Sequence, residues 1–115
     1  MKERTTVKKN YEFRRLYKRG ASAVGRAMVL YARPNRRSES RVGITVSAKL
    51  GKAVRRNRVR RRLREVFRLH RAELKQGYDC ILVARSRAAS APFSELEKQF
   101  LSLSGELSLL REERP

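Results

Sequence analysis

The sequence predicts a single α+β domain. Its 115 residues are enough to bury one hydrophobic core but too few for a catalytic domain plus a separate binding domain. Segments with helical periodicity alternate with short runs of β-branched and apolar residues, and no repeat or low-complexity linker divides the chain. We therefore expect one domain over residues 1–115, with an ordered core of about 10–110, a basic N-terminal arm (1–9) and a charged C-terminal tail (111–115).

The N-terminal half is expected to form a helix followed by three strands. Asn10 is a candidate N-cap for a helix over Tyr11–Arg19, which carries apolar residues on one face. A short extended segment is expected around 21–24. The β-branched and aromatic residues of 27–32 and 41–46 predict two further strands, and we expect these two to pair as a hairpin because polar, turn-like residues separate them.

The C-terminal half is expected to add a helix, a strand and a helix, which gives the order αβββαβα. The segment GKAVRRNRVRRRLREVFR (51–68) predicts an amphipathic helix, and the apolar run 78–84 predicts a buried strand. Ser94 and Glu97 form a candidate capping box for the last helix. The apolar face of the first of these helices is expected to contain Val59, Leu63, Val66, Phe67 and Leu74.

The charge of the chain predicts a polyanionic partner. Its 30 Lys and Arg residues against 11 Asp and Glu residues leave a formal net charge of +19, which opposes folding unless a partner neutralises it. Nucleic acid is the expected partner, because no apolar run approaches the roughly 20 residues of a membrane-spanning helix and the N-terminus has no secretory h-region. Cys80 is the only cysteine and lies in an apolar run, which favours a buried thiol and a cytoplasmic location.

The second predicted helix is the candidate nucleic-acid contact. Eight arginines lie among the fourteen residues 55–68, and Asn57, Arg61, Arg64 and Arg68 project away from the apolar face. A charge run is usually a solvated surface. Mixed Lys and Glu would serve that purpose equally well, however, whereas planar guanidinium groups match phosphate oxygens and stack on bases. The composition therefore favours phosphate binding by this helix.

The segments RVGITVS and GKAVRRNRVRRRLRE resemble the signature of the bacterial ribonuclease P protein subunit. The match rests on Arg56-Asn57-Arg58, which follow Ala53-Val54 and correspond to the RNR motif of that family, and the similarity extends from about Tyr11 to Leu107. The resemblance implies an α/β sandwich with a left-handed βαβ crossover, although right-handed crossovers are the general rule. It also implies that a protein monomer binds one large catalytic RNA together with precursor tRNA, and that the RNA and its Mg²⁺ cleave the 5′ leader.

The resemblance assigns two groups of residues to RNA. The motif positions expected to contact the catalytic RNA are Arg56, Asn57, Arg58, Arg60, Arg61, Arg64 and Arg68. Those expected to contact the single-stranded leader are Phe13, Tyr17, Val29, Tyr31, Arg41, Thr45, Ser47, Lys49 and Lys52. Two alternatives stay open: Arg56 projects towards the apolar side and could be structural, and aromatic residues at helical spacing are more often part of a core.

Catalytic groups are not expected in the protein itself. The sequence has no His/Cys cluster, no evident pair of carboxylates and one histidine, His70, which is expected to be structural. We therefore predict no catalytic residue, no protein-only metal site, and Mg²⁺ bound mainly by the RNA. Ala48 occupies a position where the family commonly has a second lysine, so one phosphate contact is expected to be missing. The main alternative is a small basic ribosomal-type RNA-binding protein, and a protein-only nuclease or a DNA-binding helix is less favoured.

Overall fold

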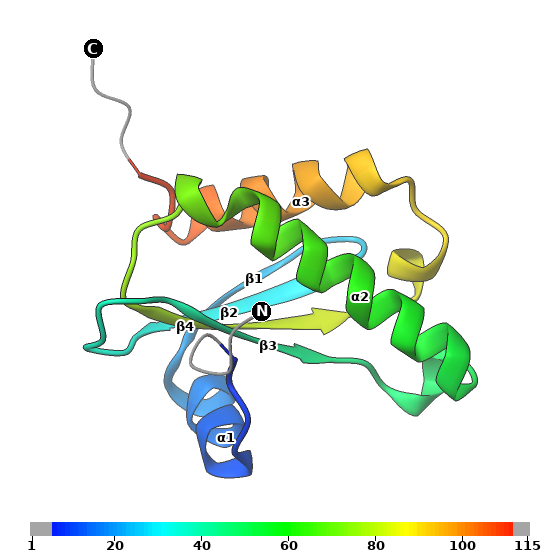
Figure 1. Ribbon diagram of the computed structural model, residues 1–115, viewed down its shortest axis with the longest axis horizontal. Coiled ribbons are helices and arrows are strands. Elements are labelled where there is room, and N and C mark those ends of the chain that lie inside the picture. The colour runs from blue at the N-terminus through cyan, green and yellow to red at the C-terminus, as the bar shows by residue number, and fades with distance from the viewer. Residues whose placement is uncertain (1–5, 112–115) are drawn as a thin grey trace.

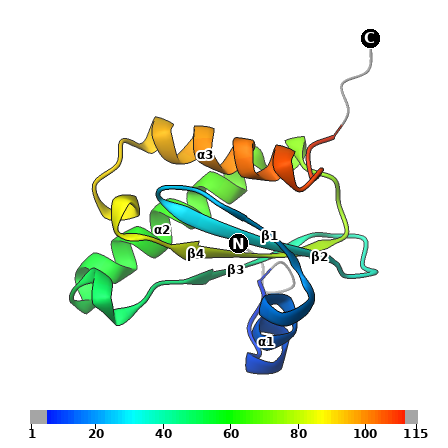
Figure 2. The ribbon, with the colours of Figure 1, turned by 180° about the vertical axis from the view of Figure 1, so that it is seen from behind.

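The computed structural model describes residues 6–111, so most of the predicted N-terminal arm (1–5) and tail (112–115) lies outside the described residues. Three helices and four strands follow one another in the predicted order αβββαβα. The helix α1 lies on one side of the sheet, and α2 and α3 lie on the other (Figures 1 and 2). The bounds are α1 Asn10–Arg19, β1 Ala21–Val24, β2 Met28–Pro34, β3 Arg41–Thr45, α2 Ala53–His70, β4 Tyr78–Ala84 and α3 Phe93–Glu106.

The strand order of the sheet is β1-β2-β4-β3. The predicted hairpin between 27–32 and 41–46 is wrong, because β4 lies between β2 and β3 and pairs with both, antiparallel to β2 and parallel to β3. Cys80, Ile81 and Leu82 of β4 are buried, and a strand this apolar is stable where helices cover both faces of the sheet. The hairpin that does form joins β1 to β2, and α2 provides the crossover from β3 to its parallel neighbour β4.

The main core lies between the sheet and the α2–α3 layer. Phe67 of α2 and Phe100 of α3 meet edge to face, with their ring centroids 6.1 Å apart. The apolar face of α2 is buried as predicted, except that α2 ends at His70. Leu74 therefore reaches the core from beyond the helix, after a single 3₁₀ turn. This packing fixes one side of α2 and leaves its arginine side free to face outward.

A smaller cluster holds α1 on the opposite face of the sheet. Leu16 is buried there with Val7 and Ile81. The backbone N–H of Val7 donates to the carbonyl of Val42 at 3.0 Å, so the ordered chain begins before residue 10. The predicted N-cap Asn10 is instead the first residue of α1, and Lys9 occupies the cap position.

The start of α3 also differs from the prediction. Pro92 takes the N-cap position, and its carbonyl accepts from the N–H of Glu95 at 3.0 Å. Ser94 lies inside the helix, which already begins at Phe93, and the carboxylate of Glu97 lies 2.7 Å from His70 Nε2. A long-range partner has replaced the local one that the S-x-x-E pattern suggested.

Candidate RNA-binding surfaces

Three rows of side chains cross the face of the sheet that carries α1. The register of β2, β4 and β3 aligns Val29, Val83 and Thr45 in one row. The central row is Tyr31, Ile81 and Gly43, and the third row is Arg33, Asp79 and Arg41. Because side chains alternate along a strand, all three rows point to the α1 side. The face is therefore apolar and aromatic at one end and charged at the other.

Aromatic rings from α1 and β2 meet at the apolar end, in what we call the aromatic patch (Phe13, Tyr17, Val29, Tyr31 and Thr45). The ring centroids of Tyr17 and Tyr31 are 5.0 Å apart in an edge-to-face arrangement, and those of Phe13 and Tyr17 are 6.4 Å apart. The structure thus brings together five of the residues predicted to contact the leader.

The members of the aromatic patch differ in exposure. Phe13 is half-buried and lies so close to Gly43 that a Cβ at that glycine would come within 2.7 Å of the ring. Tyr31 is also half-buried, whereas 41% of Tyr17 is exposed. Phe13 and Tyr31 therefore help to fill the smaller core, and Tyr17 offers the most accessible ring for stacking.

Arg41 does not extend the aromatic patch. It lies in the charged row, its residue is 8% exposed, and its Nη2 is 2.6 Å from both Glu12 Oε2 and Asp79 Oδ2. Its Nε donates to Asp79 Oδ1 at 2.8 Å as well. These charge-assisted bonds raise the pKa of the Arg41 guanidinium, with the bond to Asp79 as the largest cause. The geometry gives Arg41 a structural role that ties α1 to β3 and β4.

The loop between β3 and α2 carries the remaining polar residues assigned to the leader. Ser47, Lys49 and Lys52 are exposed, and the Ser47 hydroxyl accepts from the N–H of Lys49 at 3.2 Å. Among residues 6–111, no carboxylate pairs with either lysine. Gly51 has φ 126°, in the left-handed region that favours glycine, and it lets the chain turn into α2. The loop therefore joins the aromatic patch to the start of the arginine helix.

The motif arginines on α2 have different partners. Arg56 is half-buried and its Nε donates to the carbonyl of Gly51 at 3.1 Å, which supports the structural alternative for this residue. Arg60 donates to Asn57 Oδ1 at 2.8 Å, so Asn57 orients a guanidinium. Arg68 pairs with Glu65 at 2.5 Å.

The other three motif arginines remain available to a ligand. Arg58 and Arg61 are exposed and Arg64 is half-buried. Within the described part of the chain, none of the three has a carboxylate partner. Arg58, Arg61 and Arg64 are therefore the motif positions whose guanidinium groups are free to meet RNA phosphates.

Sequence reasoning missed Arg62 and Phe93. Arg62 donates to the carbonyl of Ala88 at 2.8 Å and also to that of Ala91, so it fastens α2 to the segment before α3. Phe93 is half-buried beside the arginines. Together they close a surface hollow of about 500 Å³, lined by Arg58, Arg61, Arg62, Arg64, Glu65, Arg68 and Phe93. No local pattern marks Arg62, because its partners lie 26 and 29 residues away.

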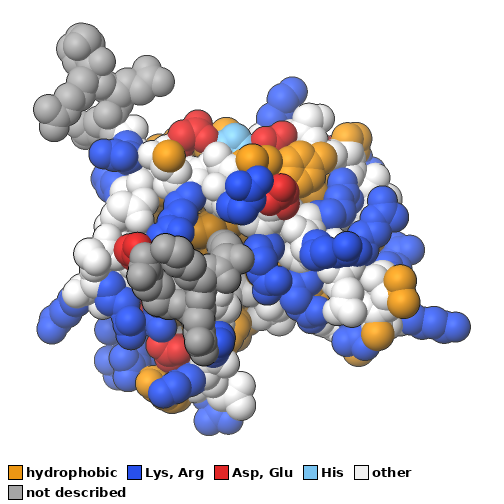
Figure 3. All heavy atoms as spheres, in the orientation of Figure 1, with side chains coloured by type: hydrophobic (Ala, Val, Ile, Leu, Met, Phe, Trp, Pro, Cys, Tyr) orange, Lys and Arg blue, Asp and Glu red, His pale blue; other side chains and the backbone are white. Residues whose placement is uncertain are grey.

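The positive charge is spread over two regions of the visible surface. Figure 3 shows Lys and Arg side chains gathered at the right, around the start of α2, and at the lower left, around α1. This distribution fits a partner that contacts the protein over a wide area rather than at a single point.

The described residues do not form a metal-binding cluster. Within residues 6–111, no three His, Cys, Asp or Glu side chains come together in a way that could hold a metal ion. His70 lies between Glu73 and Glu97 and is a satisfied structural residue, as predicted. Burial raises the pKa of the Cys80 thiol to about 12, which leaves it unreactive. No helix within 6–111 is long and apolar enough to span a membrane.

Known proteins resemble this chain over most of its length. The family model for Ribonuclease P matches residues 1–108. The Ribonuclease P protein component of Natranaerobius thermophilus is 41% identical over 111 residues, covering 96% of each chain. That of Caldanaerobacter subterraneus is 44% identical over 104 residues, covering 90% of each.

Solved structures extend the comparison to three dimensions. The RNase P protein of Staphylococcus aureus has a TM-score of 0.82 and 32% identity, covering 93% of this chain and 98% of its own. That of Thermotoga maritima has a TM-score of 0.78 and 28% identity, covering 95% and 98%. Sequence and fold thus agree over nearly the whole length of the protein, and the chain belongs to the Ribonuclease P protein family.

Proposed function

We propose that this chain is the protein subunit of a ribonuclease P, binding one catalytic RNA through α2 and the single-stranded 5′ leader of precursor tRNA through the aromatic patch. The names of its relatives, "Ribonuclease P protein component", support the assignment to this RNA-processing enzyme. They do not favour the alternative of a ribosomal-type protein. A single protein bound to a single RNA is the simplest arrangement for a chain of this size.

The observation that carries this proposal is the continuity of the two surfaces. Thr45 at the end of β3 belongs to the aromatic patch, and α2 begins at Ala53. The intervening loop is short and carries exposed Ser47, Lys49 and Lys52. A strand of RNA on the aromatic patch would therefore lie next to an RNA bound along α2. The protein could then hold the leader beside the catalytic RNA.

The chemistry of each surface suits its proposed ligand. Guanidinium groups such as those of Arg58 and Arg61 bind phosphate oxygens through paired donors, which suits a folded RNA. A ring such as that of Tyr17 can stack on any base, for about 1–3 kcal/mol per base, without reading sequence. Tolerance of sequence is what an enzyme that processes many precursor tRNAs requires.

We assign the cleavage step to the RNA. The described carboxylates and His70 are held in ion pairs or lie apart from one another, so they offer no cage for a divalent cation. Mg²⁺ with its preferred oxygen ligands would instead be held mainly between RNA phosphates. The role of the protein is then to bind and position both RNAs, through electrostatics and stacking.

Reconstitution tests the proposed function. The purified protein is added to a bacterial ribonuclease P RNA, and cleavage of precursor tRNA is followed at low Mg²⁺ concentration. We expect the protein to stimulate cleavage and to be inactive alone. Binding of leader-bearing precursor should weaken with salt, with a log-log slope of about −0.7 for each single-strand phosphate neutralised. Absence of stimulation would refute the subunit role, and cleavage by the protein alone would refute the assignment of chemistry to the RNA.

A further inference from the structure

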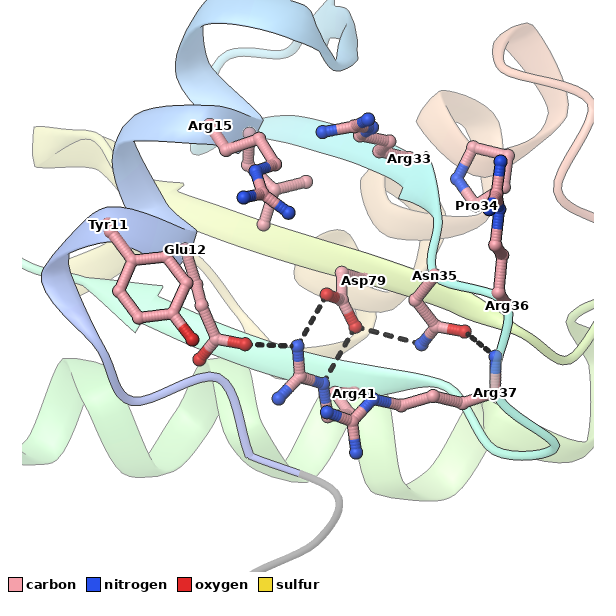
Figure 4. A pocket seen from close by; sticks show the side chains of 11 residues that line it. Tyr11, Glu12, Arg15, Arg33, Pro34, Asn35, Arg36, Arg37, Arg41 and Asp79 are labelled. Atoms are coloured by element: carbon pink, nitrogen blue, oxygen red, sulfur yellow. Dashed lines mark hydrogen bonds and ion pairs between the residues drawn. The ribbon is translucent and has the colours of Figure 1, made fainter.

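A second basic site lies at the charged end of the α1 face, away from the aromatic patch. Here α1, the end of β2 and the loop that follows it surround a hollow of about 440 Å³ (Figure 4). We call it the arginine pocket. Its walls are Tyr11, Glu12, Arg15, Leu16, Arg33, Pro34, Asn35, Arg36, Arg37, Arg41 and Asp79. Five arginines thus face two carboxylates.

Both carboxylates of the arginine pocket are already occupied. Arg41 binds Glu12 and Asp79 at 2.6 Å each, and Asp79 Oδ1 accepts a further bond from Asn35 Nδ2 at 2.8 Å (Figure 4). Within the described part of the chain, no carboxylate pairs with the four arginines that remain, which are Arg15, Arg33, Arg36 and Arg37. The pocket therefore holds an uncompensated positive charge.

Arg33 differs from an ordinary solvent-exposed arginine. Its Nη1 is buried and has no hydrogen-bond partner. Arg33 extends from β2 and Arg15 from α1 into the same hollow (Figure 4). A buried donor without an acceptor is unfavourable, and a second cation beside it adds repulsion. An anion between the two side chains would remove both costs.

We propose that the arginine pocket binds a phosphate group of a nucleotide, with Arg33 and Arg15 as its main ligands. A volume of about 440 Å³ falls in the range of small-molecule sites, so the pocket can admit more than the phosphate alone. Tyr11 at the rim is 55% exposed and offers a ring for the attached base. The site is separate from both surfaces of the proposed function and does not depend on that function.

Pyrophosphate is the probe for the free protein. Arginine Nε–Hε resonances are followed by NMR as pyrophosphate is added at constant ionic strength. We expect Arg33 and Arg15 to shift and saturate at a concentration about tenfold lower than exposed Arg14, which lies on α1 but outside the pocket. A response of Arg33 no stronger than that of Arg14 would overturn the proposal. This test needs no catalytic RNA, so it is independent of the reconstitution experiment.

Charge-matched variants separate a ligand site from a structural role. Arg33→Gln and Arg15→Gln should lose about tenfold in pyrophosphate affinity, and Arg14→Gln should lose little. Without any anion, Arg33→Gln should unfold at the same temperature as the parent protein or a higher one, because it removes an unpaired buried donor. A clear fall in the unfolding temperature, with pyrophosphate binding unchanged, would make Arg33 a structural residue instead.

The source of the phosphate is decided with two RNAs. A leader oligonucleotide and the catalytic RNA are each titrated with Arg33→Gln and with Arg14→Gln. One RNA should bind Arg33→Gln about tenfold more weakly than it binds the parent protein, while it binds Arg14→Gln as tightly as the parent. That RNA is the one whose phosphate enters the pocket. If both RNAs bind Arg33→Gln as tightly as the parent protein, but pyrophosphate binds it more weakly, the pocket takes a free nucleotide. If pyrophosphate and both RNAs bind the variants alike, the pocket is not an anion site.

Discussion

The hydroxyl of Tyr17 on α1 lies 2.8 Å from the hydroxyl of Thr45 on β3, so residues 28 positions apart meet at the rim of the aromatic patch. This bond fixes the ring of Tyr17 beside that of Tyr31. A ring held in place loses less entropy when a base stacks on it. The structure therefore separates two contributions of Tyr17, the stacking surface of its ring and the anchoring of its hydroxyl.

Tyr17→Ala should weaken binding of leader-bearing precursor tRNA by about 1–3 kcal/mol, because it removes a stacking ring. Tyr17→Phe keeps the ring and should cost less than half as much. Mature tRNA, which lacks the leader, should bind the parent protein and both variants equally. Filter binding at one fixed salt concentration measures all of these affinities. Equal losses for precursor and mature tRNA would show that Tyr17 serves the fold rather than the leader.

Arg61 and Arg62 are neighbours on α2 that should separate RNA binding from stability. Arg62→Ala leaves two carbonyl groups without a donor and should lower the free energy of unfolding by about 1–3 kcal/mol. Arg61→Ala removes an exposed cation and should leave stability within about 0.5 kcal/mol, while weakening binding of the catalytic RNA. Urea unfolding and RNA titration of both variants test this pair. The reverse pattern would contradict the assignment of Arg62 to the fold.

Arg41→Gln should destabilise the protein by about 3 kcal/mol, because it leaves Glu12 and Asp79 without their cation in a largely buried site. The free energy of unfolding of the double variant Arg41→Gln/Asp79→Asn should fall by less than the sum of the losses in the two single variants. Unfolding in urea gives both values. Strictly additive losses would mean that Arg41 and Asp79 do not stabilise one another.

The same network predicts a loss of stability in acid. Burial tends to raise the pKa of Glu12 and Asp79. The bonds and charge of Arg41, together with the bonds from the Lys9 N–H to Glu12 and from Asn35 to Asp79, outweigh burial and lower both pKa values. Their contribution is therefore complete above their usual values, near pH 4, and is lost as the pH falls through the lowered ones. Arg41→Gln should show a weaker acid dependence than the parent protein in unfolding measured between about pH 6 and 3.

His70 predicts a pH dependence of the opposite sign. Burial tends to lower its pKa, but Glu73 and Glu97 outweigh burial and raise it. Its stabilising charge is therefore present below the usual value of about 6.5 and is lost as the pH rises through the raised pKa. The difference in unfolding temperature between the parent protein and His70→Gln should shrink from about pH 6 to pH 8.5. A constant difference over this range would show that protonation of His70 does not matter.

Local patterns predicted the elements well and their partners poorly. The ranges of β1 and β4 were predicted correctly. For β4 the reason is that a short apolar run bounded by turn residues is typical of a buried strand, whereas in β1 only Ala23 is buried. The predicted pairing of β2 with β3 was wrong. The two strands are close in sequence, but β4, which comes later in the chain, lies between them in the sheet. The predicted caps at Asn10 and Ser94 were also wrong, because α1 already begins at Asn10, α3 begins at Phe93, and the carboxylate of Glu97 bonds to distant His70.

The candidate sites divide in the same way. The aromatic patch and the arginine side of α2 follow from residue type and periodicity, together with the family resemblance. The structural role of Arg41 and the existence of the arginine pocket do not, because both depend on which strands lie side by side. Arg33 is unremarkable in the sequence until β4 places Asp79 between it and Arg41.

The sequence by itself determined that this protein is a single basic α+β domain with an amphipathic arginine helix and the motif of one RNA-binding family. Those features depend on periodicity and composition, which are local properties that can be determined from the sequence of each segment. Only the tertiary structure decided which cations are neutralised and which remain free. A guanidinium such as that of Arg41 or Arg62 is bound by groups more than 20 residues away, and folding alone brings those groups together.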